Sequence, residues 1–290
     1  MKNFLYQISL LLTLSVFVSS CEDAIDLDLG NPVSQVVIDA VINQTTDTQW
    51  IYVSKSSAYL NNGQAQGYLV DSLGILDTLN FVFHKFQMKE SGKYFFVPPA
   101  ANTFQFGQTY QLAVFDKQNT YVSESKLNAP TSIDSLTVKY EKNGPFGGSE
   151  GNYITLWSKD KVGVGDYYWF KLYRNDSLQS KASDIRIAID NSTTPGGNGD
   201  GDLFIIPIRQ NFSSRPYLKN ETARIEILSI TPEMYLYLNL INTQLQNVGL
   251  FAVPPTNVPT NIICINNPQI KLLGFFCMAG KVSSDKLVIP

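Results

Sequence analysis

The sequence predicts an all-β protein, with an N-terminal immunoglobulin-like β-sandwich and a second β-rich domain that contains one short α-helix. Apolar and polar residues alternate over many short runs, and turn residues separate these runs. The chain has 17 Phe and 15 Tyr, while charged residues make up only 16%. Such a composition is typical of extracellular β-proteins. Helical spacing of apolar residues stands out only after Thr231.

The first predicted domain covers residues 30–128. Its runs of β-branched and aromatic residues predict strands over residues 36–42, 49–54, 79–88, 93–97, 109–115 and 120–125. Such short strands, at intervals of about 8–12 residues, favour an immunoglobulin-like sandwich. Ala129 and Pro130 mark the expected boundary with the next domain.

The second predicted domain covers residues 129–290. Strands are expected over residues 133–140, 153–158, 166–173, 185–189, 203–208, 224–228, 272–276 and 286–289. Thr231 is a good N-cap, Pro232 suits the first helical position, and Glu233 complements the helix dipole. These three residues predict a helix over about residues 232–246.

The N-terminus reads as an export signal. Lys2 precedes an apolar run over residues 5–18, which is too short to span a bilayer but suits a signal peptide. The run ends in Val18-Ser19-Ser20-Cys21, which resembles a bacterial lipobox. We therefore expect residues 1–20 to be removed and Cys21 to carry lipid, such as palmitate. The alternative is an ordinary secretory signal that happens to precede a cysteine.

An acidic tether, residues 21–29, follows the signal peptide. Glu22 and Asp23 come directly after Cys21, and this arrangement resembles the surface-export signal of Bacteroidetes lipoproteins. It predicts an outer-membrane protein anchored by lipid and facing the cell exterior. The alternative is a solvated linker on a periplasmic lipoprotein.

Charge and histidine content argue against several functions. Loss of Lys2 with the signal peptide changes the net charge from -3 to -4, and no basic stripe suggests a nucleic-acid partner. His84 is the only histidine, so a multi-histidine zinc site is excluded. His84 sits in an aromatic run, which favours a structural position over catalysis. We expect no cofactor and no enzymatic activity.

Two further sites have weaker signals. Cys264 and Cys277 are the two cysteines that remain once Cys21 carries lipid, and an oxidising compartment favours a disulfide between them. Such a disulfide would stabilise the fold by about 3 kcal/mol. Two buried free thiols are the alternative. Asn198, Asp200 and Asp202 alternate with glycines, as in some Ca²⁺ loops, but Arg209 stands where an EF-hand needs glutamate. A solvated turn is the favoured interpretation, so no metal is expected.

Several landmarks in order resemble one family. They are Cys21-Glu22-Asp23, Val53-Ser54-Lys55-Ser56-Ser57, Gly107-Gln108-Thr109-Tyr110, Ser229-Ile230-Thr231-Pro232-Glu233 and Leu273-Gly274-Phe275-Phe276. The pattern resembles the Bacteroidetes outer-membrane lipoproteins grouped as domain of unknown function 4249, and it covers most of the mature chain. Asn220-Glu221-Thr222 departs from it, where a Gly-Asp-Thr turn is usual, as does the loop over residues 266–271. The resemblance implies a surface lipoprotein, often found beside TonB-dependent transporters, with no known activity.

These inferences favour a non-enzymatic accessory or ligand-capture partner of a TonB-dependent transporter. The alternative is a surface hydrolase that acts on glycans or peptides. It is motivated by the aromatic-rich second domain, although half of an alternating strand faces the core. A third interpretation is a role in adhesion or envelope structure.

Overall fold

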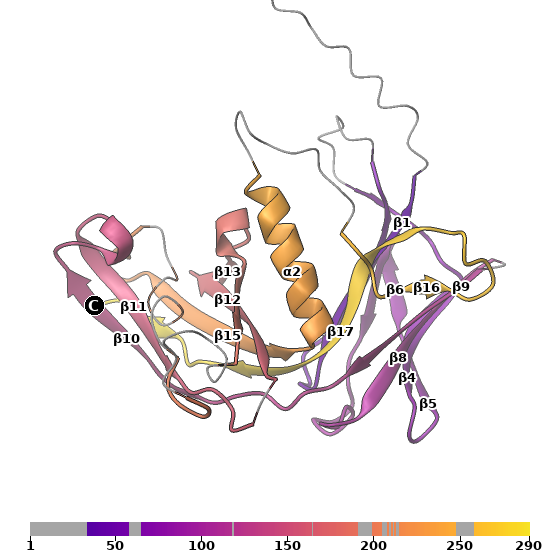
Figure 1. Ribbon diagram of the computed structural model, residues 1–290, viewed down its shortest axis with the longest axis horizontal. Helices are drawn as coiled ribbons and strands as arrows, with labels where there is room; N and C mark the ends of the chain where they lie inside the picture. Colours follow the sequence, from indigo (N-terminus) through magenta and orange to yellow (C-terminus); the bar gives the residue numbers. More distant parts are fainter. Residues whose placement is uncertain are drawn as a thin grey trace, which may run out of the picture. The chain divides into compact units, whose positions relative to one another are not determined.

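The structure is a computed structural model that describes residues 34–57, 65–117, 119–163, 165–190, 199–204, 208, 210, 212, 215–247 and 258–290. Residues Ser34–Pro290 form one compact unit. The all-β prediction is confirmed, because strands dominate the described residues and they include a single α-helix, α2 (Pro232–Leu245) (Figure 1). The predicted signal peptide and tether lie outside these ranges. None of the helices in these ranges is long and apolar enough to cross a bilayer.

The largest sheet follows the order β13-β12-β15-β17-β1-β2-β7-β6, with β14, β18 and β3 attached beside it. Its strands are β1 (Val36–Asn43), β2 (Gln49–Lys55), β3 (Gln66–Gly67), β6 (Gln87–Glu90), β7 (Lys93–Phe96), β12 (Tyr167–Arg174), β13 (Ser177–Leu178), β14 (Arg186–Ile189), β15 (Thr222–Ile230), β17 (Leu272–Ser283) and β18 (Leu287–Val288).

Two smaller sheets complete the fold. The five-stranded sheet has the order β16-β9-β8-β4-β5 and consists of β4 (Ser72–Asp77), β5 (Val82–Lys85), β8 (Thr109–Asp116), β9 (Asn119–Lys126) and β16 (Ile263–Cys264). β10 (Ile133–Glu141) and β11 (Gly151–Ser158) form a two-stranded sheet. The short 3-10 helices are η1 (Pro145–Gly147) and η2 (Ala182–Asp184).

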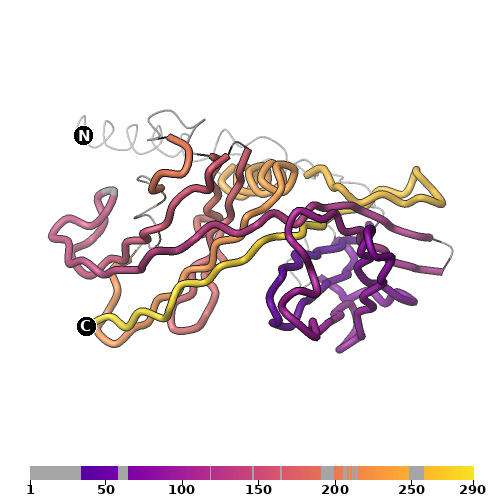
Figure 2. Tube along the Cα trace, turned by 90° about the horizontal axis from the view of Figure 1, so that it is seen from below, coloured from indigo at the N-terminus to yellow at the C-terminus, as the bar shows by residue number. Residues whose placement is uncertain are grey.

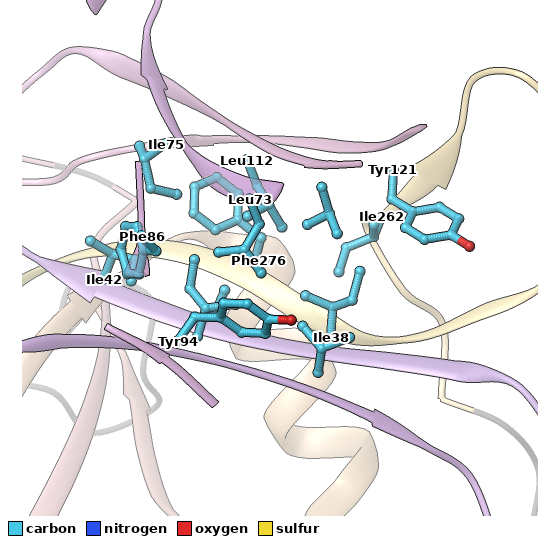
Figure 3. Packing of buried hydrophobic residues seen from close by; sticks show 14 of the residues in the cluster. Ile38, Ile42, Leu73, Ile75, Phe86, Tyr94, Leu112, Tyr121, Ile262 and Phe276 are labelled. Atoms are coloured by element: carbon cyan, nitrogen blue, oxygen red, sulfur yellow. The ribbon is translucent and has the colours of Figure 1, made fainter. Parts of the chain in front are cut away.

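The sandwich core lies between the five-stranded sheet and one face of the largest sheet. Ile38 from β1 and Phe276 from β17 pack in one cluster with Leu73 and Leu112 from the opposite sheet (Figure 3). All four side chains are completely buried, and each contributes about 1.5–3 kcal/mol through burial. β16 and β17 come from the C-terminal part of the chain, so the sandwich includes strands from beyond residue 129. The domain boundary predicted at Ala129 and Pro130 stays a prediction.

β1 and β17 join the two ends of the described chain. They pair in parallel, with Val36 opposite Leu272 and Asn43 opposite Ala279 (Figure 2). The approach is closest at Gly274, which has a φ of +92°, and a Cβ atom there would lie 2.0 Å from the carbonyl oxygen of Ile38. Only glycine suits this position, because a side chain would meet both a strained backbone and a neighbouring strand.

The helix prediction is confirmed by α2. The Thr231 hydroxyl accepts a hydrogen bond from the Met234 backbone N–H at 3.3 Å, and Pro232 occupies the first turn. Met234 and Leu238, one helical turn apart, are buried against the large sheet. Figure 1 shows α2 lying across β12 and β17. The helix therefore covers the sheet face that points away from the sandwich core.

Candidate ligand-binding site on the helix-bearing face

The helix-bearing face is the side of β1, β12, β15 and β17 that carries α2. Side chains alternate along each strand, so Phe276 points into the sandwich while Phe275 and Cys277 point toward the helix. The same alternation places charged residues on this face beyond the apolar contacts of α2. They come from all four strands and fall into two groups, which differ in whether their charges have partners.

The first group is a network in which each charge is satisfied. Glu226 ion-pairs with Arg224, lies 3.8 Å from the Lys281 ammonium, and accepts a hydrogen bond from the Tyr173 hydroxyl at 2.9 Å. Burial, together with the Glu226 carboxylate, raises the pKa of Tyr173 to about 12. Lys281 also donates to the Asp47 carboxylate at 2.6 Å, which lowers the pKa of Asp47. This network holds β12, β15 and β17 together and leaves no charge for a ligand.

The second group, the unpaired trio, consists of Asp39 on β1, Lys171 on β12 and Tyr237 on α2. Lys171 places its ammonium 4.0 Å from the centroid of the Trp169 ring, a cation–π contact. Throughout the part of the chain that the structure describes, no hydrogen bond or ion pair involves the side chains of these three residues. The trio therefore has hydrogen-bonding capacity that the described residues do not use.

The members of the trio nevertheless influence one another electrostatically. Burial lowers the pKa of the Lys171 amine, opposed by the carboxylates of Glu226 and Asp39. Nearby protein atoms remove part of the water around Asp39 and so raise the pKa of its carboxyl, while Lys171 opposes this rise. The Asp39 side chain is still exposed to solvent. Burial raises the pKa of Tyr237 to about 12, and Asp39 adds to that effect. Asp39 thus acts electrostatically on both Lys171 and Tyr237.

Aromatic side chains surround the trio. The Tyr237 ring packs on Phe275, with centroids 4.7 Å apart. Tyr52 stands opposite Asp39 in the β1–β2 register and is 44% exposed. Trp50 lies beside Tyr52, with ring centroids 6.5 Å apart and planes inclined by 23°. Apolar surface thus lies next to unsatisfied polar groups, a combination typical of small-molecule sites.

The predicted lipidation and export residues Cys21, Glu22 and Asp23 lie outside the described residues, as does Asn198 of the weak metal candidate. Asp200 uses its carboxylate to accept a hydrogen bond from the Gly163 backbone at 2.8 Å. Within the ranges that the structure covers, no group of three or more His, Cys, Asp or Glu side chains is arranged to hold a metal ion.

The expected disulfide between Cys264 and Cys277 is absent, because both are buried free cysteines. Cys264 pairs with Tyr121 in the β9–β16 register and belongs to the sandwich core. Cys277 faces α2 on the other side of β17. The two cysteines lie on strands with different partners, since β16 pairs with β9 and β17 pairs with β1 and β15. The thiols therefore enter different clusters.

His84 lies on β5 among aromatic rings. Its ring centroid is 5.4 Å from that of Phe96 and 5.2 Å from that of Phe104. Burial lowers the pKa of His84, partly opposed by Asp77. These contacts favour the structural interpretation of the histidine.

The sequence interpretation missed the unpaired trio, although two signals were present. Asp39 interrupts the apolar run Val36-Val37-Ile38, and Lys171 interrupts the aromatic run Tyr167-Tyr168-Trp169-Phe170. A charged residue inside such a run indicates a strand with one face that is not packed entirely against apolar side chains.

The fold and the site together define a β-sandwich protein with an extended sheet and a polar, aromatic-lined face beside helix α2. The chain belongs to the family described as Domain of unknown function (DUF4249), whose model matches residues 22–285. No curated protein matches the chain.

Proposed function

We propose that this protein is a lipid-anchored outer-membrane protein that faces the cell exterior and acts as a non-enzymatic ligand-capture partner of a TonB-dependent transporter. The observation that carries the proposal is the lipobox-like Val18-Ser19-Ser20-Cys21, followed at once by Glu22 and Asp23. A lipid on Cys21 would hold the domain at a membrane, and the acidic residues would direct it to the outer leaflet.

The unpaired trio supports a role in ligand capture. Asp39, Lys171 and Tyr237 present a carboxylate, an ammonium and a hydroxyl beside aromatic rings. Polar groups without protein partners gain most from a ligand that supplies the missing hydrogen bonds.

Exposed apolar residues support a protein partner. The outer face of the five-stranded sheet carries Phe83, Phe115, Ile263 and Ile265, which are 39%, 42%, 61% and 56% exposed. The rings of Phe83 and Phe115 are in contact, with centroids 6.4 Å apart. Contiguous apolar surface on a soluble domain marks an interaction site. We assign this outer face to contact with the transporter.

The anchoring can be tested by cell fractionation and protease shaving of intact cells. Cys21→Ala should release the protein from the outer membrane. Replacing Glu22 and Asp23 with alanine should keep the lipid and lower the fraction cut by protease. If the native protein resists shaving while a known surface lipoprotein is cut, the proposed exterior location is wrong.

The partnership can be tested by crosslinking at native expression, followed by detergent extraction and mass spectrometry. A β-barrel transporter should be recovered with the native protein. Combined Phe83→Asp and Phe115→Asp substitutions should reduce that recovery, whereas Val162→Asp, at a position 85% exposed elsewhere, should not. Recovery of the lipoprotein alone would contradict the proposal.

A further inference from the structure

The β4–β5 hairpin and the loop before β8 lie together at one end of the sandwich, and Figure 1 shows the hairpin at its foot. The Thr78 hydroxyl in the hairpin turn donates a hydrogen bond to the backbone carbonyl of Thr109, the first residue of β8, at 2.7 Å. Both segments carry large apolar side chains that protrude into solvent. These side chains, which we call the apolar end, are Leu79, Phe81, Val82 and Phe106, at 65%, 82%, 47% and 48% exposure.

Phe81 combines the greatest exposure of the four with a strained backbone. Its φ is +54°, in the left-handed region, which is unfavourable for a bulky residue and easier for asparagine or glycine. Because its ring is so exposed, it adds little to the core. A strained residue whose side chain does not support the fold points to a function outside it.

Hydrogen bonds hold the hairpin turn in one shape. The buried Asp77 carboxylate accepts hydrogen bonds from the backbone N–H groups of Leu79 and Asn80, at 2.9 and 3.0 Å, and from the Asn80 side chain at 2.9 Å. The turn therefore presents its apolar side chains in a preformed arrangement, which lowers the cost of ordering them at another surface.

The sequence at this end is free of charge. Residues 78–83 and 94–115 contain no Asp, Glu, Lys or Arg, although 16% of the chain is charged. Moving a charge out of water is costly, whereas apolar rings beside uncharged polar groups suit the boundary between lipid headgroups and acyl chains. The two loops therefore have the composition of a membrane contact.

The predicted anchor is long enough to allow such a contact. Ser34 lies at the other end of the sandwich, where its hydroxyl donates to the Ser56 carbonyl beside the start of β1. Cys21 precedes Ser34 by 13 residues, a length of chain that spans at most about 45 Å. β1 has 8 residues and spans about 26 Å. A lipid on Cys21 and the apolar end can thus reach the same bilayer.

We propose that the apolar end inserts into the interfacial region of a lipid bilayer, with Leu79 and Phe81 reaching the first part of the acyl chains. This inference rests on the membrane location proposed above and adds a second contact to the lipid on Cys21. A single flexible tether leaves a domain free to turn, whereas a second contact fixes its tilt. The outer face of the five-stranded sheet then stands upright on the membrane, where it can meet a neighbouring membrane protein.

Fluorescence quenching in vesicles tests the proposal on the whole protein. Phe81→Trp and the control Val162→Trp, at a position 85% exposed in another part of the chain, are reconstituted into vesicles of phosphatidylcholine and phosphatidylglycerol, with or without bromine on the acyl chains. The emission of the native protein, which has three tryptophans, is subtracted. The indole introduced at position 81 should lose most of its emission to bromine, and the indole at position 162 should not. Equal quenching at the two positions would overturn the inference.

Photocrosslinking distinguishes a bilayer from an apolar pocket on a protein. Phe81→benzoylphenylalanine in intact cells should crosslink to lipid after illumination. Crosslinks to protein alone would show that the apolar end binds a protein and would contradict the proposal.

Phe81→Asn separates membrane contact from folding. Because asparagine adopts the left-handed conformation more easily, the urea midpoint should rise by roughly 0.3 M. Val162→Asn should leave the midpoint unchanged. Both are measured in the Cys21→Ala background, which carries no lipid and is studied without detergent. A lower midpoint for Phe81→Asn would mean that the ring supports the fold, and the inference would fail.

Mass spectrometry of Cys21 in the same preparations keeps the two proposals apart. Lipid on Cys21 without quenching at position 81 would reject this inference alone. Quenching at position 81 without lipid on Cys21 would reject the proposed anchor alone, and the absence of both would reject both.

Discussion

Glu221→Gln should destabilise the protein by removing the anion from a partly buried ion pair with Arg174. Glu221 accepts hydrogen bonds from the Arg174 side chain at 3.1 Å, from Arg215 at 3.1 Å and from the Leu218 backbone at 2.7 Å. Arg174 also packs its guanidinium on Tyr217, 3.9 Å from the ring centroid. Glutamine keeps the shape of the side chain, so the substitution tests charge more than packing.

The size of the effect follows from the carboxyl pKa. Hydrogen bonds from Arg174 hold the pKa of Glu221 at about 2, against an ordinary value of 4.5. Since one pKa unit corresponds to about 1.4 kcal/mol, this difference sets an upper limit of about 3 kcal/mol. Arg215 is 56% exposed, so water screens its share of the attraction. We expect Glu221→Gln to cost about 2 kcal/mol at pH 7.

The pH dependence has a definite sign. The pKa of Glu221 is lower in the folded than in the unfolded protein, so the stabilisation is fully present above about pH 4.5. It declines as the pH falls from there toward 2, because the unfolded chain binds the proton first. The free-energy difference between native protein and the variant should therefore shrink by more than half between pH 7 and pH 3.

Urea unfolding followed by circular dichroism at both pH values measures this difference. Glu141→Gln is the control, because Glu141 forms an ion pair with Lys139 at 2.9 Å in which the lysine side chain is 69% exposed. That pair should contribute about 0–1 kcal/mol. A Glu221→Gln cost that is equal at pH 7 and pH 3, or no larger than that of the control, would refute the electrostatic reasoning.

The remaining predictions concern backbone, thiols and metal. Gly274→Ala should cost about 3 kcal/mol or more in urea unfolding, because its Cβ would collide with the neighbouring strand. Gly107→Ala, at φ +81° with open space around it, should cost only about 1–2 kcal/mol. Cys264 and Cys277 should titrate as two thiols in unfolded, non-reduced protein. In the folded protein they should react slowly, since both are buried and burial raises the pKa of Cys277 to about 11. If no thiol is detected in the unfolded protein, the disulfide prediction is correct after all. A chelator should leave the melting temperature unchanged, because Asp200 already accepts a backbone hydrogen bond, whereas a fall of several degrees would indicate a metal site.

Local elements of this fold follow from the sequence. The alternation in 36–42 predicts a strand with one buried face, and Val36, Ile38, Ala40 and Ile42 are buried as that pattern requires. Thr231 and Pro232 predict the start of α2, since capping depends on neighbours within one turn. Information within a few residues is sufficient for both.

Long-range arrangement does not follow in the same way. Nothing near residues 272–276 indicates that this strand pairs in parallel with β1, because pairing depends on segments far apart in the chain. The disulfide prediction failed because compartment and spacing do not say which side of a strand faces which cluster. The trio was missed for a related reason: its members come from β1, β12 and α2, which only the folded sheet brings together.

The parallel pairing of β1 with β17 makes completion of the core depend on two segments far apart in the chain. β17 supplies Phe276 and Met278 to the core that β1 begins, and the two strands lie far apart in the sequence. Until residues 272–283 arrive, β1 has an open edge and the sandwich lacks one wall of its core. A chain shortened before this strand should therefore remain protease-sensitive, because β1 cannot complete the sandwich core without β17.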